Sequence, residues 1–253
     1  MYIVNQNDQM VLIDNFCWPD PLPGPRNPDY AQKLGELVRC NEGLYEMATV
    51  LGMPFVSGKD SMKNDAVVNY NQQKTKISVL PTLLITSMGH IEDIHQTVHS
   101  RFKSQEDLWL LGGENELHPF TLLTLQNKPR GEWSRTEPIF LKERYQAYHR
   151  AVKLGLIRGA HDVSEGGTLT ALIEMSINSE LGFNLNLSTD VELFGEGMGM
   201  IVFSSAFNHR EKIKAHFKNL KRIGTTRDDQ IIIVGLEQMN LQECLKHFKG
   251  TKS

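Results

Sequence analysis

The sequence His-Asp-Val-Ser-Glu-Gly-Gly at residues 161–167 is the stretch whose residue types point most directly to chemistry. Adjacent glycines remove side chains where the backbone must approach something closely, and they can leave amide N–H groups facing an anion. A helix predicted from Thr168 to about Glu180 would add its unpaired first-turn amides and the positive end of its dipole. Asp162 could hold a metal ion against the same anion. The pattern is typical of a phosphate site with Mg²⁺; the alternative is a plain helix start, with Ser164 as N-cap and the glycines as a tight turn.

A second polar stretch, Ser-Gly-Lys-Asp-Ser-Met-Lys-Asn-Asp at residues 57–65, follows a short predicted strand. A glycine-bearing polar loop after a strand is a frequent site geometry in α/β folds. Its Gly-Lys pair resembles part of a P-loop, but that motif needs glycine where this chain has Met53 and Ser or Thr where it has Asp60. The P-loop is therefore excluded, and an exposed charged turn remains as the alternative to a site.

The elements before this loop are predicted from apolar runs and helix caps. Residues 10–14 form a buried strand ending in Asp14, and a proline-rich segment follows it. Asn-Pro-Asp at 27–29 begins a helix that Gly52 ends. One face of that helix carries Tyr30, Leu34, Leu37, Val38, Asn41, Leu44, Tyr45, Ala48 and Leu51. Residues 76–86 read as one long strand, with Pro81 indicating an edge or a bulge.

The polar, weakly patterned residues 89–104 mark the expected domain boundary. A second α/β unit then begins with a strand at 107–111 and a glycine turn. We predict further elements along it: a helix or strand at 120–125, a helix at 140–156, strands at 182–187, 200–203 and 231–234, helices at 208–220 and 241–248, and a turn at 223–225. The glycines at 195–199 precede their strand, whereas a dinucleotide fingerprint follows one, so that fold is excluded.

Composition excludes several classes of partner. The formal net charge of −3 gives no electrostatic reason to expect nucleic acid or an anionic membrane surface. No apolar run reaches the roughly 20 residues of a membrane span. The three cysteines, Cys17, Cys40 and Cys244, are widely spaced and not in CxxC pairs, which predicts reduced thiols in a cytoplasmic protein. The nine histidines show no metal-ligand spacing.

Four stretches, taken in order, resemble one family. They are Asp-Asn-Phe-Cys-Trp at 14–18 with the prolines behind it, residues 57–64, residues 161–167, and Phe-Gly-Glu-Gly at 194–197. The set resembles the second half of the synthase core of the phosphoribosylformylglycinamidine synthase family, within the AIR-synthetase-like superfamily. The resemblance covers nearly the whole chain. It implies an α/β (α+β) fold, with an N-terminally truncated A-type sheet domain at 1–103 and a B-type α/β domain at 104–253.

The resemblance implies an ATP-dependent carbon–nitrogen ligase of de novo purine biosynthesis. Formylglycinamide ribonucleotide, ATP and glutamine-derived ammonia would give formylglycinamidine ribonucleotide, ADP and phosphate. ATP phosphorylates the amide oxygen and ammonia displaces the phosphate, which requires anion-binding backbone, Mg²⁺ and exclusion of water. The implied partners are the first half of the synthase core, a glutaminase domain or subunit, and the ribonucleotide substrate. A homodimer through the A-type sheet is a further option.

Ligand contacts are carried over only where this chain matches the family's motifs. Asp162 corresponds to a Mg²⁺ ligand and Ser61 to a contact with the substrate phosphate; no catalytic residue is assigned. Nucleotide contacts correspond to Asp14, Gly58, Lys59, Ser164, Gly166 and Gly167. Lys59 stands where shorter relatives have an asparagine near the metal; a protonated lysine cannot ligate Mg²⁺, so phosphate pairing is its expected role. Met200 replaces an arginine of many relatives, which weakens an anion role for that loop.

Other family features are missing from this sequence. Relatives carry an acidic metal-binding strand and a Glu-x-x-x-Asn helix before the Asp14 strand, as well as a first half with a catalytic histidine. We therefore expect a fragment that does not catalyse the reaction alone. The resemblance is compatible with either the catalytic or the auxiliary nucleotide site. Alternatives are a non-catalytic nucleotide-binding scaffold that holds ADP, and another ATP-dependent AIR-synthetase-like enzyme.

Overall fold

The computed structural model describes residues 10–70, 72–91, 93–113 and 137–250. Contacts between residues divide the chain at position 93 into two compact units. We call residues 4–92 the N-terminal unit and residues 93–253 the C-terminal unit. The division falls inside the polar stretch 89–104, and the assignment of the units as A-type and B-type domains stays a prediction. Among the described residues, no helix has the length and apolar character needed to span a membrane.

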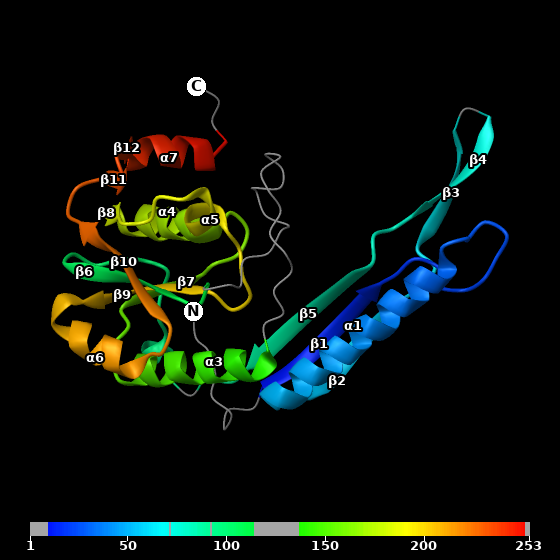
Figure 1. Cartoon of the computed structure of the whole chain (residues 1–253), viewed down its shortest axis with the longest axis horizontal. Helices are drawn as coiled ribbons and strands as arrows, with labels where there is room; N and C mark the ends of the chain where they lie inside the picture. Colours follow the sequence, from blue (N-terminus) through cyan, green and yellow to red (C-terminus); the bar gives the residue numbers. More distant parts are fainter. Residues whose placement is uncertain (1–9, 71, 92, 114–136, 251–253) are drawn as a thin grey trace. The chain divides into compact units, whose positions relative to one another are not determined.

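The N-terminal unit is a three-stranded sheet with one long helix beside it (Figure 1). The central strand β1 pairs in parallel with β2 and antiparallel with β5, and β3 and β4 form a separate hairpin. The elements are β1 (Met10–Cys17), α1 (Tyr30–Leu51), β2 (Phe55–Ser61), β3 (Asp65–Tyr70), β4 (Gln73–Ser78) and β5 (Thr82–Gly89). The predicted strand at 10–14 and the predicted helix are confirmed. Gly52 ends α1 in the left-handed conformation, with φ of 72°.

Two predictions for this unit are wrong. Residues 57–61 are not a loop, because their backbone pairs with β1 as far as the Cys17–Ser61 register position. Polar side chains cover both faces of that strand, so no apolar alternation reveals it. Residues 76–86 are not one strand either, since β4 ends at Ser78 and β5 begins at Thr82. Pro81 lies between these two strands, where its missing N–H removes no hydrogen bond between paired strands.

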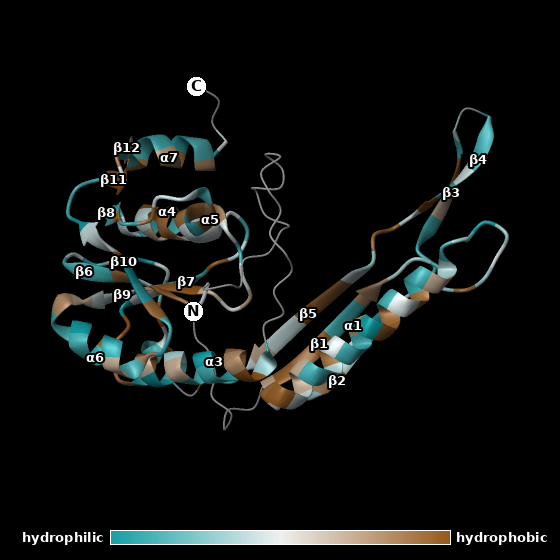
Figure 2. Cartoon of the chain, in the orientation of Figure 1, coloured by the Kyte–Doolittle hydropathy of each residue, from teal (hydrophilic) through white to brown (hydrophobic). Residues whose placement is uncertain are grey.

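The predicted apolar face of α1 is mostly exposed. Tyr30, Leu34, Val38 and Tyr45 have exposed fractions between 36% and 73%, and Figure 2 shows apolar residues recurring along α1. The helix residue that is buried is instead Lys33. Its ammonium binds Asp29 at 2.9 Å and Asn27 Oδ1 at 2.8 Å, so the charge is compensated.

The C-terminal unit is a seven-stranded sheet of order β12-β11-β8-β10-β6-β9-β7, in which β8 and β11 form the parallel pair. Its strands are β6 (Glu106–Leu111), β7 (Gly159–Asp162), β8 (Gly182–Leu185), β9 (Ile201–Ala206), β10 (Leu220–Arg227), β11 (Ile231–Val234) and β12 (Glu237–Asn240). Its helices are η1 (Ile94–Gln96), α3 (Pro138–Lys153), α4 (Gly167–Ser179), α5 (Asp190–Phe194), η2 (Phe207–His209), α6 (Arg210–His216) and α7 (Leu241–Phe248).

Helices cover both faces of this sheet, with α4 on one side and α3 and α6 on the other (Figure 1). Strand β6 is buried along its whole length, and its side chains alternate between two cores. Leu108 and Leu110 pack with α4, whereas Trp109 and Leu111 pack with α3 and α6. The C-terminal unit therefore has a complete three-layer core of its own.

One prediction here is wrong and two are partly right. Residues 223–225 are not a turn but lie inside β10, where the pairing with β6 shifts register between Arg222 and Gly224. A Cβ at Gly224 would lie 2.0 Å from the Asn184 carbonyl oxygen, so the glycine permits close strand approach. The helix predicted at 208–220 is shorter, and the strand at 182–187 ends at Leu185. The segment at 120–125 lies outside the described residues.

Candidate functional site

The loop at residues 161–167 joins the end of the edge strand β7 to the start of α4. His161 and Asp162 belong to β7, and Asp162 pairs in register with Ile201 of β9. The N-cap is Gly166, with no side-chain cap, so the proposed Ser164 N-cap is wrong. The Ser164 carbonyl instead accepts the Gly167 amide at 3.1 Å. The loop therefore forms a tight turn between strand and helix.

A second motif, residues 194–200, packs directly on this loop. The Val163 amide donates to the Met200 carbonyl at 3.0 Å, and the Gly166 amide donates to Glu196 Oε1 at 2.9 Å. A Cβ at Gly167 would lie 2.6 Å from the Phe194 Cα. The structure thus brings together two motifs that are about 30 residues apart in the sequence. We call residues 161–167 with residues 194–200 the glycine-loop pair.

Gly166 and Gly167 are both buried and both adopt positive φ, of 90° and 74°. Their amides have acceptors within the chain, the Glu196 carboxylate and the Ser164 carbonyl. Neither amide is therefore free in this structure, and the binding of a nucleotide phosphate by Gly166 and Gly167 stays a prediction. For Gly166 the physical reason is tertiary, because the loop at 194–200 supplies the acceptor of its amide; the acceptor of the Gly167 amide lies in its own turn.

The Asp162 carboxylate is an exposed charged group of the loop, with a side chain 60% exposed. A hydrogen bond from His161 lowers its pKa to about 2, against the opposing effect of burial, and Ser164 adds a further hydrogen bond. Asp162 is therefore ionised at neutral pH and accessible to a ligand, and Ser164 lies beside it.

His161 connects β7 to α4. Its Nδ1 lies 2.8 Å from the Asp162 carbonyl oxygen, and its Nε2 lies 3.0 Å from Glu174 Oε2. Both of those oxygens only accept, so the protonated imidazolium satisfies both contacts. The hydrogen bond to the Asp162 side chain also raises the His161 pKa, with burial opposing it. The role of Glu174 was not predicted, since it depends on which helical face meets the strand.

Thr168, in the first turn of α4, is a further polar residue that sequence reasoning missed. It is fully buried, and its Oγ1 has no hydrogen-bond partner among the described residues. A buried hydroxyl without a partner is uncommon and is retained at a cost in stability. It lies next to the glycine turn at the positive end of the α4 dipole.

The residues of the loop fit a metal that arrives with a phosphate ligand better than a resident metal. Within the described ranges, no cluster of three or more His, Cys, Asp or Glu side chains is placed to hold an ion. Mg²⁺ prefers carboxylate oxygens and usually keeps several waters and substrate phosphates in its shell. Asp162 supplies an ionised, accessible carboxylate of that kind.

The remaining predicted residues lie together in the N-terminal unit. Strands β1 and β2 place Asp14 opposite Gly58 and Asn15 opposite Lys59. A Cβ at Gly58 would lie 1.8 Å from Asp14 Oδ1, so the carboxylate lies against the glycine. Gly58 and Lys59 are exposed.

Ser61 ends β2, and its Oγ lies 3.1–3.2 Å from the side-chain atoms of Asn64. The predicted site residues therefore form two sets, one in each unit. Each set places an aspartate beside glycine-bearing backbone.

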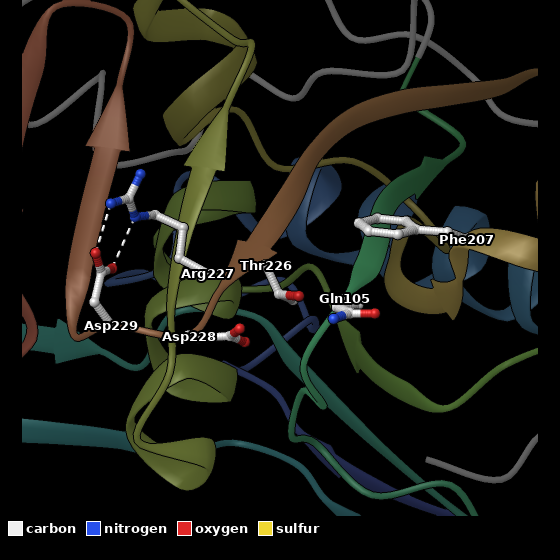
Figure 3. Close-up of a pocket in the computed structure, with 6 residues that line it drawn as sticks. All are labelled: Gln105, Phe207, Thr226, Arg227, Asp228 and Asp229. Carbon is white, nitrogen blue, oxygen red and sulfur yellow. Dashed lines mark hydrogen bonds and ion pairs between the residues drawn. The ribbon is translucent and has the colours of Figure 1, made fainter.

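A cavity of about 520 Å³ on the C-terminal unit contains none of the predicted residues (Figure 3). It lies at the end of the sheet where β6 begins and β9 ends, opposite to the Asp162 end of β9. Its lining residues are Gln105, Phe207, Thr226, Arg227, Asp228 and Asp229. Arg227 and Asp229 face each other and pair at 2.5 Å and 2.7 Å, so much of the charge is already compensated.

A family model described as AIR synthase related protein, C-terminal domain, matches residues 107–237, slightly more than half of the chain. The chain belongs to the AIR synthase related family. Within this family, its sequence is 30% identical to a phosphoribosylformylglycinamidine synthase subunit PurL from Thermoplasma volcanium, over 87% of this chain and 30% of the relative. The PurL subunit from Petrotoga mobilis is 31% identical over 77% of this chain and 26% of that protein.

Solved structures show the same fold at low sequence identity. A Thermotoga maritima PurL complexed with ATP aligns with a TM-score of 0.58 and 14% identity, over 94% of this chain and 38% of that chain. The hydrogenase maturation protein HypE from E. coli aligns with a TM-score of 0.61 and 18% identity, over 93% of this chain and 74% of that one. The AIR-synthetase-like α/β fold predicted from the sequence is confirmed. This chain spans at most about a third of the length of the curated relatives described above.

Proposed function

We propose that this chain is part of a phosphoribosylformylglycinamidine synthase. The whole enzyme would convert formylglycinamide ribonucleotide to formylglycinamidine ribonucleotide with ATP and glutamine-derived ammonia. The observation that carries the proposal is that the four motifs form two pairs in space, one within each unit. Residues 161–167 lie on residues 194–200, and Asp14 of β1 lies on Gly58 of β2. The PurL relatives, at 30% and 31% identity, support the same assignment.

Each of the two sets of residues would bind ligand groups within its own unit. Asp162 would hold Mg²⁺ that arrives with the nucleotide phosphates, and Ser164 would contact the nucleotide. Gly166 and Gly167 would shape the turn under the phosphates. In the N-terminal unit, Lys59 would pair with phosphate as a point charge. When bound, Mg²⁺ would neutralise phosphate charge during phosphoryl transfer.

The N-terminal unit would supply nucleotide and substrate contacts of its own. Asp14 and Gly58 would line the nucleotide, and Ser61 would contact the substrate phosphate. The partners we propose are the first half of the synthase core and a glutaminase that supplies ammonia. Strands β2 and β5 each pair only with β1 within the described residues, so a second copy of the sheet could pair there.

We further propose that this chain binds nucleotide but does not complete the reaction alone. The curated relatives are about three times as long as this chain, so we expect the complete reaction to need residues from other parts of the enzyme. An assay for formylglycinamidine ribonucleotide, with ATP and ammonia supplied, should give no product. Product formation by the pure chain would contradict this part of the proposal.

Calorimetric titration with Mg-ADP and Mg-ATP tests the site itself. We expect micromolar binding, weakened at least tenfold in Asp162→Ala. The matched control is Asp228→Ala, which removes an exposed carboxylate at the opposite end of the sheet. Absence of binding by the folded chain, or equal affinity in Asp162→Ala, would remove the support for a nucleotide site at this loop.

A further inference from the structure

Glu196 places a carboxylate where the proposed function requires a phosphate. It lies in the loop between α5 and β9, and its Oε1 accepts the Gly166 amide at 2.9 Å. Gly166 is the N-cap of α4, where the helix presents its positive end. The chain therefore already provides its own anion at the start of this helix.

The surrounding backbone keeps the loop in place. The Gly195 amide donates to the Val191 carbonyl at 2.9 Å, and the Val163 amide donates to the Met200 carbonyl at 3.0 Å. A Cβ at Gly167 would collide with the Phe194 backbone, so the two chain segments already touch. The Gly166 amide is therefore freed most easily by rotation of the Glu196 side chain, which is half-buried.

An entering phosphate would meet two obstacles at this amide. The single N–H already has a carboxylate acceptor, and a charge-assisted hydrogen bond is stronger than a neutral one. The Glu196 charge would also repel a second anion at short range, and Asp162 adds to that repulsion. Both obstacles are removed if the carboxylate swings away or loses its charge.

We propose that Glu196 is an internal competitor that occupies the phosphate position at the start of α4 until a nucleotide phosphate displaces it. This inference rests on the proposed function of the loop. It assigns Glu196 the role of a residue that sets the affinity of the site for phosphate, and it makes displacement of the Glu196 side chain a step of binding.

The variant Glu196→Gln tests the proposal, because it keeps an oxygen acceptor and the side-chain volume but removes the charge. We expect Mg-ADP and inorganic phosphate to bind about tenfold more tightly to Glu196→Gln than to the unaltered chain. Glu196→Ala, which also removes the acceptor, should bind at least as tightly as Glu196→Gln. Glu165→Gln is the matched control for a neighbouring charge, and we expect its affinity to rise less than threefold.

The Gly166 amide resonance in ¹H–¹⁵N spectra provides a direct readout. Its chemical shift in ligand-free Glu196→Gln should differ from that in the ligand-free unaltered chain. In the unaltered chain, the chemical shift should change when Mg-ADP is added. Equal affinities of Glu196→Gln and the unaltered chain, or weaker binding by the variant, would overturn the proposal for Glu196 while the nucleotide site stands. Absence of binding by both folded proteins would overturn the nucleotide site and the proposal together.

Discussion

The glycine-loop pair of the C-terminal unit and the Asp14–Gly58 contact of the N-terminal unit are built differently. Gly167 lies against the backbone of Phe194, and the hydrophobic core that packs against α4 lies behind it. Gly58 lies against the far end of one side chain, that of Asp14. In the described part of the N-terminal unit, the buried hydrophobic side chains are Leu12, Phe16 and Trp18. Backbone contacts over a packed core are hard to rearrange, whereas a side chain over a thin core can rotate.

The difference indicates how the two units would take part in binding. The C-terminal unit presents a preformed turn whose remaining freedom is the rotation of Glu196. The N-terminal unit presents exposed strand residues, Gly58 and Lys59, together with an exposed apolar helix face. We expect the first to be rigid without ligand and the second to gain order from whatever contacts it.

Two tyrosines, one in each unit, should show the largest difference in their effect on the free energy of unfolding. Tyr148 is fully buried in the C-terminal unit, and Tyr45 on α1 is 73% exposed. Tyr148→Ala should lower the free energy of unfolding by about 4 kcal/mol, through lost burial and the cavity it leaves. Tyr45→Ala should change it by less than about 0.5 kcal/mol. Urea unfolding followed by circular dichroism measures both; a large loss in Tyr45→Ala would mean that the α1 face is covered in solution and would break the comparison.

Gly167 and Gly58 should show the next largest difference in the stability cost of an alanine substitution. Gly167→Ala should cost about 3 kcal/mol, because its Cβ would lie 2.5 Å from the Phe194 carbonyl carbon at a φ of 74°. Gly58→Ala should cost less than about 1 kcal/mol, since Asp14 can rotate away. Gly155→Ala is the control for conformation alone, with φ of 66° and no neighbour within 4 Å. Hydrogen exchange of the β9 amides measures the loss of stability in Gly167→Ala. Equal stability costs for Gly167→Ala and Gly155→Ala would show that the contact with Phe194 can rearrange without a further cost.

Buried aspartates provide a third comparison. Burial acts to raise the pKa of Asp107, but hydrogen bonds from Arg210 and Arg222, at 2.6–2.8 Å, outweigh it and lower the pKa. Asp65 in the N-terminal unit has one cationic partner, Lys76, at 3.2 Å. Asp107→Asn should cost about 2 kcal/mol and Asp65→Asn about 1 kcal/mol, because breaking a more buried pair leaves more uncompensated charge. Thermal unfolding of both variants measures the two stability costs. A larger cost for Asp65→Asn than for Asp107→Asn would contradict the prediction.

The smallest effect concerns pH. Burial raises the pKa of Glu106 above its ordinary value of 4.5, because its side chain is fully buried; Arg158, 3.6 Å away, acts in the opposite direction but does not cancel the rise. A carboxyl with a raised folded-state pKa reduces stability once it ionises, so the penalty is absent below pH 4.5 and grows as the pH rises through the folded-state value. Glu106→Gln should therefore gain on the order of 1 kcal/mol at pH 7.5 and nothing at pH 4.

Glu211→Gln is the control for this pH dependence, because Glu211 is 82% exposed. Its stability should follow that of the unaltered chain at every pH. A gain in Glu106→Gln that is the same at pH 4 and pH 7.5 would show that packing, not ionisation, is responsible.

Local signals in the sequence predicted some elements well. The Asn-Pro-Asp start and Gly52 gave the bounds of α1, and the apolar run at 107–111 gave β6, since caps and burial act within a few residues. The short strand predicted just before residue 57 corresponds to the start of β2, but its continuation to Ser61 was missed because the pairing with β1 is set by a distant segment. Gly224 looked like a turn residue for the same reason, although its role is close approach to β8.

The candidate site shows the same limit. The sequence placed Asp162 and the glycines in one loop, and the structure agrees. The acceptor on the Gly166 amide comes from Glu196, 30 residues further along the chain. His161 meets Glu174 only because β7 lies beside α4. Spacing in the sequence cannot predict contacts that depend on how loops meet in space.

The order of strands in the C-terminal unit also has a kinetic consequence. Strand β6 is buried on both faces, yet it pairs with β9 and β10, and Glu106 is opposite Ala206. At roughly 5–20 residues per second, a ribosome would need about 5–20 s to make the chain between those two residues. During that time the apolar β6 has neither partner strand available. The centre of the sheet should therefore form late and be the segment most in need of a chaperone during synthesis.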